Sequence, residues 1–235
     1  MFYPDNVPSK RWLEYYAQHF DTVELNNTFY AMPKPDTCRT WAARTPEDFT
    51  FAVKLYRVIT HRYRLMHSER LLRDFLAAVE ALGDKLAPLL VQLPPKWSAN
   101  PERLAEFLQQ VPKSHRWAVE FRDARWLTDD VYNILREHNA ALVLHDNLPD
   151  HPHVITADFT YMRYHGTTGE KSPGLYSQKQ MAAAAREVAG LVSDGVDAYV
   201  YFNNDAHGHA LTNANQLKSL LGQEATSQVK RRRAS

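Results

Sequence analysis

The sequence lacks the residues on which several common functional sites depend. A single cysteine, Cys38, among 235 residues excludes a disulfide framework and any zinc or iron–sulfur site built from several cysteines of one chain. The eight glycines are scattered, and they form neither a Gly-x-x-x-x-Gly-Lys phosphate loop nor a Gly-x-Gly-x-x-Gly dinucleotide motif. The Gly-x-Ser-x-Gly motif of many hydrolases is also missing. These three chemistries therefore have no support in the sequence.

The chain also lacks an excess of one charge and a long apolar run. Its 28 lysines and arginines nearly balance its 27 aspartates and glutamates, so bulk charge indicates neither a nucleic-acid nor a membrane partner. No stretch of about 18 apolar residues is present, and residues 1–12 contain no signal-peptide core. Together with the single cysteine, these features predict a cytoplasmic protein without a membrane partner. They leave the oligomeric state open.

The composition predicts one folded domain followed by a tail. Apolar residues make up 44% of the chain, which is enough for one large core over residues 1–222, whereas two small domains fit less well. Residues 223–235 carry four basic side chains and few apolar ones. We therefore expect a basic, disordered tail, with nonspecific nucleic-acid contact as the minor alternative.

Seven runs rich in Val, Tyr and Phe, and bounded by Pro, Asp, Asn or Gly, have the character of β-strands. They cover residues 22–30, 49–56, 88–94, 117–122, 140–146, 161–166 and 198–204. Amphipathic helical patterns separate most of them, and one of these has Asn100 at the cap position and Pro101 at the first helical position. Strands that alternate with helices predict βα units around a parallel sheet.

We therefore predict an α/β fold of the TIM-type (β/α) barrel class rather than an open doubly wound sheet. Two irregularities accompany this prediction. Residues 147–158 contain two prolines and no helical pattern, so the sixth helix should be degenerate. The chain also opens directly into a helical pattern, so the first strand of the barrel should be missing.

The polar residues of the predicted strands share one phase. In the first run Val23 and Leu25 lie on one face, and Glu24 and Asn26 lie on the other. In a barrel the apolar set faces the helices and the other set faces the lumen. The same alternation in the other runs predicts a lumen set near the carboxyl ends of the strands, where barrel enzymes carry their sites. This set is Glu24, Asn26, Lys54, Gln92, Glu120, Arg122, His145, Arg163, His165, Tyr201 and Asn203.

The fully charged members of the lumen set carry an excess of positive charge, with Lys54, Arg122 and Arg163 against Glu24 and Glu120. One interpretation is an internal salt-bridge network that holds the barrel together. The excess, to which the two histidines can add, instead favours an anionic ligand such as a phosphate, sulfate or carboxylate. Both interpretations stay open at this stage.

A metal site is the less favoured alternative. His207 and His209 with Asp205, or His145 with Asp146, would supply suitable ligand types. A spaced histidine pair around a glycine is more typical of a turn, and a cationic neighbourhood opposes a metal ion. We expect residues 205–209 to form the turn into the final helix, with neither a metal nor a cofactor.

Three residues at strand ends have a predicted position. Trp126 either stacks on a sugar or base or caps the barrel as a loop aromatic. Asn203 should point into the cavity beside Arg163 and His165, because its phase is opposite to that of the apolar residues of its strand. Asn204 should bond the backbone, as asparagines at turns do.

Several segments together resemble the DUF72 family, also called the YecE-like family. They are FYP, FDTVELNNTFY, FAVKLYRVITH, LLVQLPPKW, AVEFRDARW, YMRYHG and VYFNNDAHGHALTNA. The resemblance extends to about Leu221, and it implies a TIM-type barrel whose biochemical role is not established. The polar positions of the family motifs fall on Glu24, Asn26, Tyr30, Lys54, His61, Gln92, Glu120, Arg122, Trp126, Arg163, His165, Gly166, Asn203 and Asn204.

The sequence departs from the family pattern in two places. Family members have a strand of the Gly-Thr-Ser-Gly-Trp type before FYP, whereas Met1 directly precedes FYP here. A late assigned start, a truncation or an incomplete barrel would each account for this. His207 and His209 are not positions of the family motif, which further disfavours a metal.

The leading functional hypothesis is an enzyme that acts on a small anionic or phosphorylated, sugar-like compound by general acid/base chemistry. In it Lys54, Arg122 and Arg163 hold the anion, Glu24 or Glu120 is the acid or base, and His165 transfers protons. The further ligand contacts in this hypothesis are Asn26, Tyr30, Gln92, Trp126, His145, Tyr201 and Asn203. The alternatives are a nucleic-acid-binding or nucleic-acid-processing protein and a noncatalytic ligand-binding protein.

Overall fold

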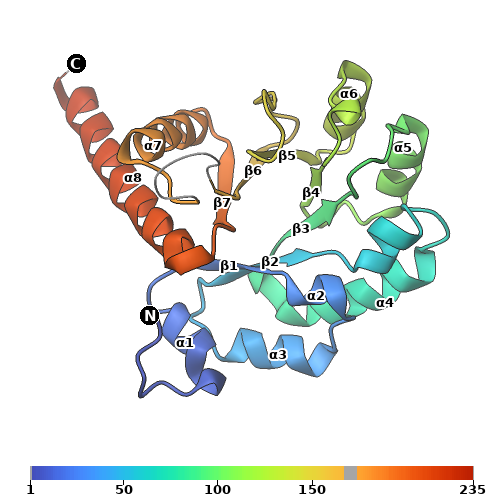
Figure 1. Cartoon of the computed structure of the whole chain (residues 1–235), viewed down its shortest axis with the longest axis horizontal. Coiled ribbons are helices and arrows are strands. Elements are labelled where there is room, and N and C mark those ends of the chain that lie inside the picture. The colour runs from blue at the N-terminus through green and yellow to red at the C-terminus, as the bar shows by residue number, and fades with distance from the viewer. Residues whose placement is uncertain (1, 167–173, 235) are drawn as a thin grey trace. The chain divides into compact units, whose positions relative to one another are not determined.

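A computed structural model of the chain describes residues 2–166 and 174–234, without the side chains of residues 223–234. The chain divides into two compact units. The first unit is Tyr3–Val143, and the second unit is Leu144–Ser235 together with Met1–Phe2. The ribbon in Figure 1 follows the chain from strand β1 to helix α8.

The first unit contains parallel strands that pair in the order of the sequence. They are β1 (Thr22–Leu25), β2 (Thr50–Lys54), β3 (Leu86–Gln92), β4 (Trp117–Glu120) and the first three residues of β5 (Ala141–His145). Glu24 pairs with Ala52 across β1 and β2, and Gln92 pairs with Glu120 across β3 and β4. This register brings the polar carboxyl ends of neighbouring strands together.

Helical segments connect the strands of the first unit. They are η1 (Ser9–Arg11), α1 (Trp12–Tyr16), α2 (Asn27–Tyr30), α3 (Pro35–Ala43), the π-helix η2 (Val58–Arg62), α4 (Glu69–Val79), η3 (Glu80–Lys85), α5 (Pro101–Gln110), η4 (Ala124–Trp126) and α6 (Asp129–Glu137). Helix α5 begins where the sequence predicts: the Asn100 side chain accepts a hydrogen bond from the backbone N–H of Arg103 at 2.9 Å, and Pro101 follows it.

The second unit contains the end of β5, then β6 (Phe159–Tyr164), α7 (Gln178–Ser193), β7 (Asp197–Phe202), η5 (Ala206–Gly208) and α8 (His209–Ala234). Strands β6 and β7 are parallel, and Arg163 pairs with Tyr201. Helices α7 and α8 lie side by side (Figure 1). Their apolar faces share a core cluster of Tyr176, Met181, Ala184, Ala185 and Leu217.

The fold class predicted from the sequence is confirmed. The seven strands are parallel neighbours in sequence order and alternate with helices, as in a TIM-type barrel. Residues 146–158 contain no helix, so the sixth helix is degenerate as predicted, and no strand precedes β1 among residues 2–21. A single domain over residues 1–222 and a disordered tail over residues 223–235 stay predictions.

Helix composition adds one further observation. No helix within the described residues is both long enough and apolar enough to span a membrane.

The buried charged side chains of the strands lie at the last or second-last position of their strand. Lys54, Glu120 and Arg163 are 8%, 0% and 3% exposed, and each follows a fully buried apolar residue two positions earlier on the same face of its strand. Those earlier residues are Ala52, Ala118 and Tyr161. The strands are therefore apolar over most of their length, and buried charge is concentrated at their carboxyl ends.

The N-cap hydrogen bond of helix α5 provides a test of how much such a cap contributes to stability. Replacing Asn100 with Ala should lower the free energy of unfolding by about 1 kcal/mol, because the N–H of Arg103 loses its acceptor. Thr128 at the start of α6 is a matched control, since its side chain makes no cap hydrogen bond, and Thr128→Ala should cost clearly less. Equal losses in urea denaturation would contradict the capping role of Asn100.

Candidate functional site

In the first unit, the ends of β2 and β3 are joined by a buried lysine. Lys54 donates from Nζ to Oε1 of Gln92 at 2.6 Å, and the same ammonium lies 4.2 Å from the centre of the Phe29 ring. An ammonium removed from water needs such partners, because desolvation otherwise disfavours its charge. The structure thus brings together two residues of the predicted lumen set.

The carboxylates of the first unit are also hydrogen bonded. Arg122 donates from Nε to Glu120, whose side chain is fully buried. Glu24 accepts a hydrogen bond from Nδ2 of Asn26 at 3.0 Å. Part of the predicted polar set therefore forms internal pairs, as the salt-bridge interpretation requires.

His61 joins this polar region through an unusual local structure. The π-helix η2 carries it, and the ring edge packs on Phe29 with centroids 5.0 Å apart. Its Nδ1 lies 2.9 Å from the hydroxyl of Thr60. Burial, together with the cations Lys54, Arg57 and Arg122, lowers the pKa of His61 to about 4. The imidazole is consequently neutral at physiological pH, and its lowered pKa reflects the positive electrostatic potential of the nearby cations.

Two aromatic residues of the predicted site lie in opposite environments. Tyr30 is 68% exposed, whereas Trp126 is fully buried. The Trp126 ring stacks on Phe121 with centroids 5.0 Å apart and donates from Nε1 to the backbone oxygen of Trp97 at 2.7 Å. The prediction that Trp126 stacks on a ligand is therefore wrong. The alternative of a packed, capping aromatic agrees with the structure.

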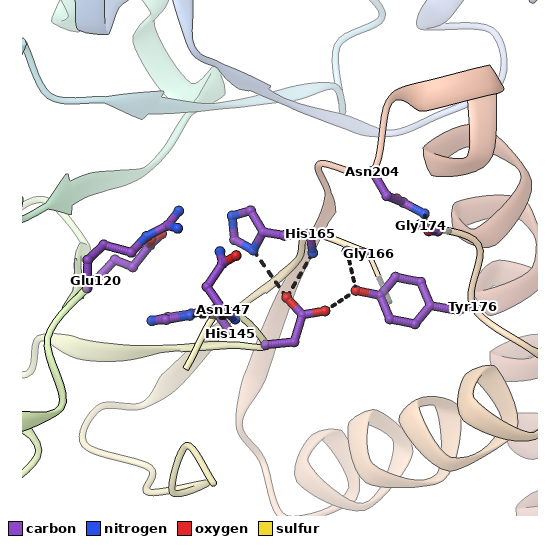
Figure 2. Close-up of polar contacts among 10 residues, drawn as sticks. Glu120, His145, Asn147, His165, Gly166, Gly174, Tyr176 and Asn204 are labelled. Carbon is purple, nitrogen blue, oxygen red and sulfur yellow. Dashed lines mark hydrogen bonds and ion pairs between the residues drawn. The ribbon is translucent and has the colours of Figure 1, made fainter. Parts of the chain in front are cut away.

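In the second unit, Asp146 is the centre of a hydrogen-bond network whose other members, His165, Gly166 and Tyr176, are labelled in Figure 2. Its Oδ1 accepts from the backbone N–H of His165 at 2.9 Å and lies 3.3 Å from Nδ1 of the same residue. Its Oδ2 accepts from the hydroxyl of Tyr176, which in turn accepts from the N–H of Gly166 at 2.7 Å. The carboxylate thereby links the ends of β5 and β6 to the segment before α7.

The network defines the protonation of its members. Burial opposes ionisation of Asp146, but hydrogen bonds from His165 and Tyr176 outweigh it and leave its pKa below the ordinary value. Burial and the Asp146 contact raise the pKa of Tyr176, so the phenol stays protonated as a donor. An ionised carboxylate only accepts hydrogen bonds. The Nδ1 of His165 must therefore carry a proton, which leaves Nε2 as the basic atom of the neutral ring.

A cavity of about 300 Å³ adjoins Asp146 in the second unit. It is lined by Leu144, His145, Asp146, Leu148, Asp150, His151, His153, Met162, Arg163 and Tyr164. Its volume is at the lower end of the range for small-molecule sites, and its wall combines apolar side chains with a few polar ones, as such sites do. Two predicted site residues, His145 and Arg163, therefore share one pocket.

The two buried imidazoles of this pocket have opposite tautomers. Nδ1 of His145 accepts from the backbone N–H of Asn147 at 3.2 Å, so its proton lies on Nε2. Nδ1 of His151 faces the backbone oxygen of Pro152 at 3.0 Å and must donate to it. The two ring centroids are 4.6 Å apart. His145 therefore contributes an N–H donor on its Nε2 side.

The end of β7 agrees with the sequence prediction in part. Asn204 donates from Nδ2 to the backbone oxygen of Gly174 at 2.6 Å, which confirms that its side chain bonds backbone. Tyr201 is buried and pairs with Arg163, and the N–H of Asn203 donates to the backbone oxygen of Tyr164. The placement of the Asn203 side chain beside Arg163 and His165 stays a prediction.

Residues 205–209 form the turn into α8, as predicted, through the short helix η5. The rings of His207 and His209 are 5.6 Å apart. In the part of the chain that the structure describes, no group of three or more His, Cys, Asp or Glu side chains is placed to hold a metal ion.

Two members of the network, Asp146 and Tyr176, were not among the catalytic residues predicted from the sequence. Asp146 directly follows a buried strand, which is a recognisable position for a site residue in this fold. Tyr176 lies outside the strands, and no spacing in the sequence relates it to Asp146, 30 residues earlier.

The fold and these polar clusters define a TIM-type barrel protein with its candidate site residues at the carboxyl ends of the strands. The sequence profile of the family described as "Protein of unknown function DUF72" matches residues 1–234. The chain belongs to this family.

Named relatives and solved structures agree with this membership. The UPF0759 protein YunF of Bacillus subtilis (strain 168) is 25% identical over 252 residues, which cover 93% of this chain and 89% of YunF. The UPF0759 protein YecE of Escherichia coli (strain K12) is 35% identical over 111 residues, or 47% of this chain. That match spans only 41% of the length of YecE.

Two crystal structures of DUF72 family proteins have the same fold. One, from Thermotoga maritima MSB8, has a TM-score of 0.80 and 29% identity and covers 94% of this chain and 92% of its own. The other, from Enterococcus faecalis V583, has a TM-score of 0.77 and 24% identity, with 91% and 94% covered. The latter similarity concerns the fold alone.

Replacing Asp146 with Asn should lower the free energy of unfolding by about 1–2 kcal/mol at neutral pH, because His165 and Tyr176 lose a charged acceptor. Folding lowers the pKa of Asp146, so its contribution is fully present above the ordinary value of 3.8 and is lost as the pH falls through the lowered value. Denaturant unfolding from about pH 7 to pH 3 should show a difference from wild type that shrinks only at the acid end.

Asp150→Asn is the matched control for this experiment. Asp150 is an exposed carboxylate of the same loop, and its φ of 55° is tolerated by asparagine. The Asp150→Asn protein should have the same free energy of unfolding as wild type at each pH. An Asp146→Asn protein as stable as wild type at every pH would show that the network contributes nothing to the fold.

Proposed function

We propose that the protein is an enzyme that acts on a small anionic compound by general acid/base chemistry. The observation that supports this most is the Asp146–His165 pair next to a pocket that contains Arg163. A carboxylate that holds Nδ1–H of a histidine orients the ring and stabilises the imidazolium form, and this is how many enzymes prepare a base.

The proposed acid/base step belongs to Nε2 of His165. In the neutral ring this atom has a lone pair that takes a proton from the substrate and later returns it. Asp146 stays ionised throughout and balances the imidazolium charge, while the O–H of Tyr176 keeps the carboxylate in place. Glu120 is less suited to this role, because Arg122 holds its carboxylate.

Arg163 is the proposed anion contact of the pocket. It is 3% exposed, so its charge is shielded little by water and attracts an anion more strongly than a surface arginine does. The Nε2–H of His145 adds a neutral donor. Of the two pocket carboxylates, Asp146 is already bonded to His165 and Tyr176, and Asp150 is exposed.

We place this activity in the cytoplasm. Cys38 is fully buried and forms no disulfide, and burial raises the pKa of its thiol. A protein that needs no disulfide suits a reducing compartment.

The test is a binding and turnover screen of small phosphorylated and carboxylated compounds, by thermal shift and by NMR of the compounds themselves. His165→Asn should keep ligand affinity within a few-fold and lose at least about 100-fold in turnover, because the base is gone. Arg163→Gln should weaken binding instead. The control is His207→Asn, an exposed histidine at a φ of 57° that asparagine accepts.

The outcomes separate the alternatives. If compounds bind through Arg163 but are never converted, the protein is a noncatalytic ligand-binding protein rather than an enzyme. Turnover that survives in His165→Asn would contradict the assigned base.

A further inference from the structure

The first unit contains a cationic cluster to which neither the Asp146 network nor its pocket contributes a residue. Its members come from separate segments: Lys54 ends β2, Arg57 precedes η2, His61 lies within η2, and Arg122 follows β4. Lys54 and Arg57 both approach the ring of Phe29, at 4.2 and 5.9 Å, and the ring of His61 contacts the same aromatic group.

Arg57 makes this cluster more than an internal salt-bridge network. It is exposed, and it forms no salt bridge with any residue that the structure describes. Lys54, Arg57 and Arg122 give three cations, against the two carboxylates Glu24 and Glu120 at the strand ends of this unit. The cations of the cluster therefore outnumber these carboxylates by one.

The backbone around His61 supports a role in binding. Single π-helical turns are rare and are frequent at functional sites, and η2 is a single π-helical turn. Shortly after it, Arg64, Leu65 and His67 have positive φ values of 49°, 70° and 46°. Non-glycine residues in this region are strained, and such strain concentrates at functional sites.

We propose that Lys54, Arg57, His61 and Arg122 form a subsite for a phosphoryl group, in which His61 donates a hydrogen bond as a neutral imidazole. A tetrahedral dianion has oxygens directed to several sides, which suits cations that come from separate elements, whereas a planar carboxylate suits a single bidentate arginine. This assignment concerns the first unit alone: it takes from the proposed function only that the ligand is an anion, and the phosphoryl group is assigned as a ligand of this unit.

The neutral state of His61 gives the subsite a direct spectroscopic signal. Burial and the nearby cations lower its pKa to about 4, and an imidazole in this position is sensitive to any negative charge bound among those cations. Sulfate is the best probe for a titration, because it stays a dianion across the accessible pH range and has the shape of a phosphoryl group.

The experiment follows the His61 ring by NMR during pH titrations with and without sulfate, with its signals assigned by their loss in His61→Gln. Sulfate should raise the pKa of His61 by about one unit or more. Inorganic phosphate at neutral pH should perturb the same signals, and acetate should do so at least about tenfold more weakly. No change with either tetrahedral anion, or equal binding of acetate, would overturn the proposal.

Two exposed arginines provide a matched pair of variants. Arg57 and Arg62 each lie 5.9 Å from an aromatic ring, but only Arg57 acts on His61. Arg57→Leu should raise the pKa of His61 without any ligand and weaken sulfate binding about tenfold, whereas Arg62→Leu should do neither. Equal effects of the two substitutions would show that the cluster attracts anions only as general surface charge, and not as a specific subsite.

Two substitutions test His61, and they differ in whether the new side chain can donate a hydrogen bond. His61→Gln keeps a neutral donor and should retain sulfate affinity within a few-fold, measured by calorimetry, whereas His61→Leu should lose about tenfold. Sulfate binding that is the same in both would contradict the donor role. The result is independent of the proposed chemistry, because His165→Asn should leave the sulfate response of His61 unchanged.

Discussion

A charge buried at the end of a strand must have a partner, and the polar structure of this protein follows from that constraint. Lys54, Glu120 and Arg163 are almost completely removed from water, and an uncompensated charge there would cost several kcal/mol. Gln92 and Phe29 accommodate Lys54, and Arg122 pairs with Glu120. Buried charges that are arranged in this way keep fixed positions, which is what a binding or catalytic site requires.

Asp146, whose side chain is 30% exposed, connects chemistry to packing at the end of β5. Its desolvation is offset by donors from His165 and Tyr176, and the ring of Tyr176 belongs to the core that α7 and α8 share. The position of the His165 imidazole therefore depends on a residue that is itself fixed by apolar burial. A loop histidine without such support would sample several orientations, with a corresponding loss of preorganisation.

Much of the fold could be predicted from local pattern, whereas parts of the site could not. The alternation of strand and helix patterns gave the parallel strands in sequence order, and the prolines of residues 147–158 indicated the missing sixth helix. The sequence could not decide between the two positions predicted for Trp126, because its partner Trp97 is 29 residues away and no spacing rule relates the two. The partnership of Asp146 with Tyr176 is nonlocal in the same way, and the π-helix at His61 has no signature in the sequence.

The proposed acid/base chemistry requires that Asp146 fixes which ring nitrogen of His165 carries the proton. The ¹⁵N chemical shifts of the His165 ring measure this directly, because protonated and unprotonated ring nitrogens of a neutral imidazole have well-separated resonances. For the neutral form of the ring, the structure predicts the proton on Nδ1 and none on Nε2 in the wild type, and loss of this preference in Asp146→Asn. A wild-type ring with its proton on Nε2 would contradict the account, since Nδ1 would then have no hydrogen to donate to the carboxylate.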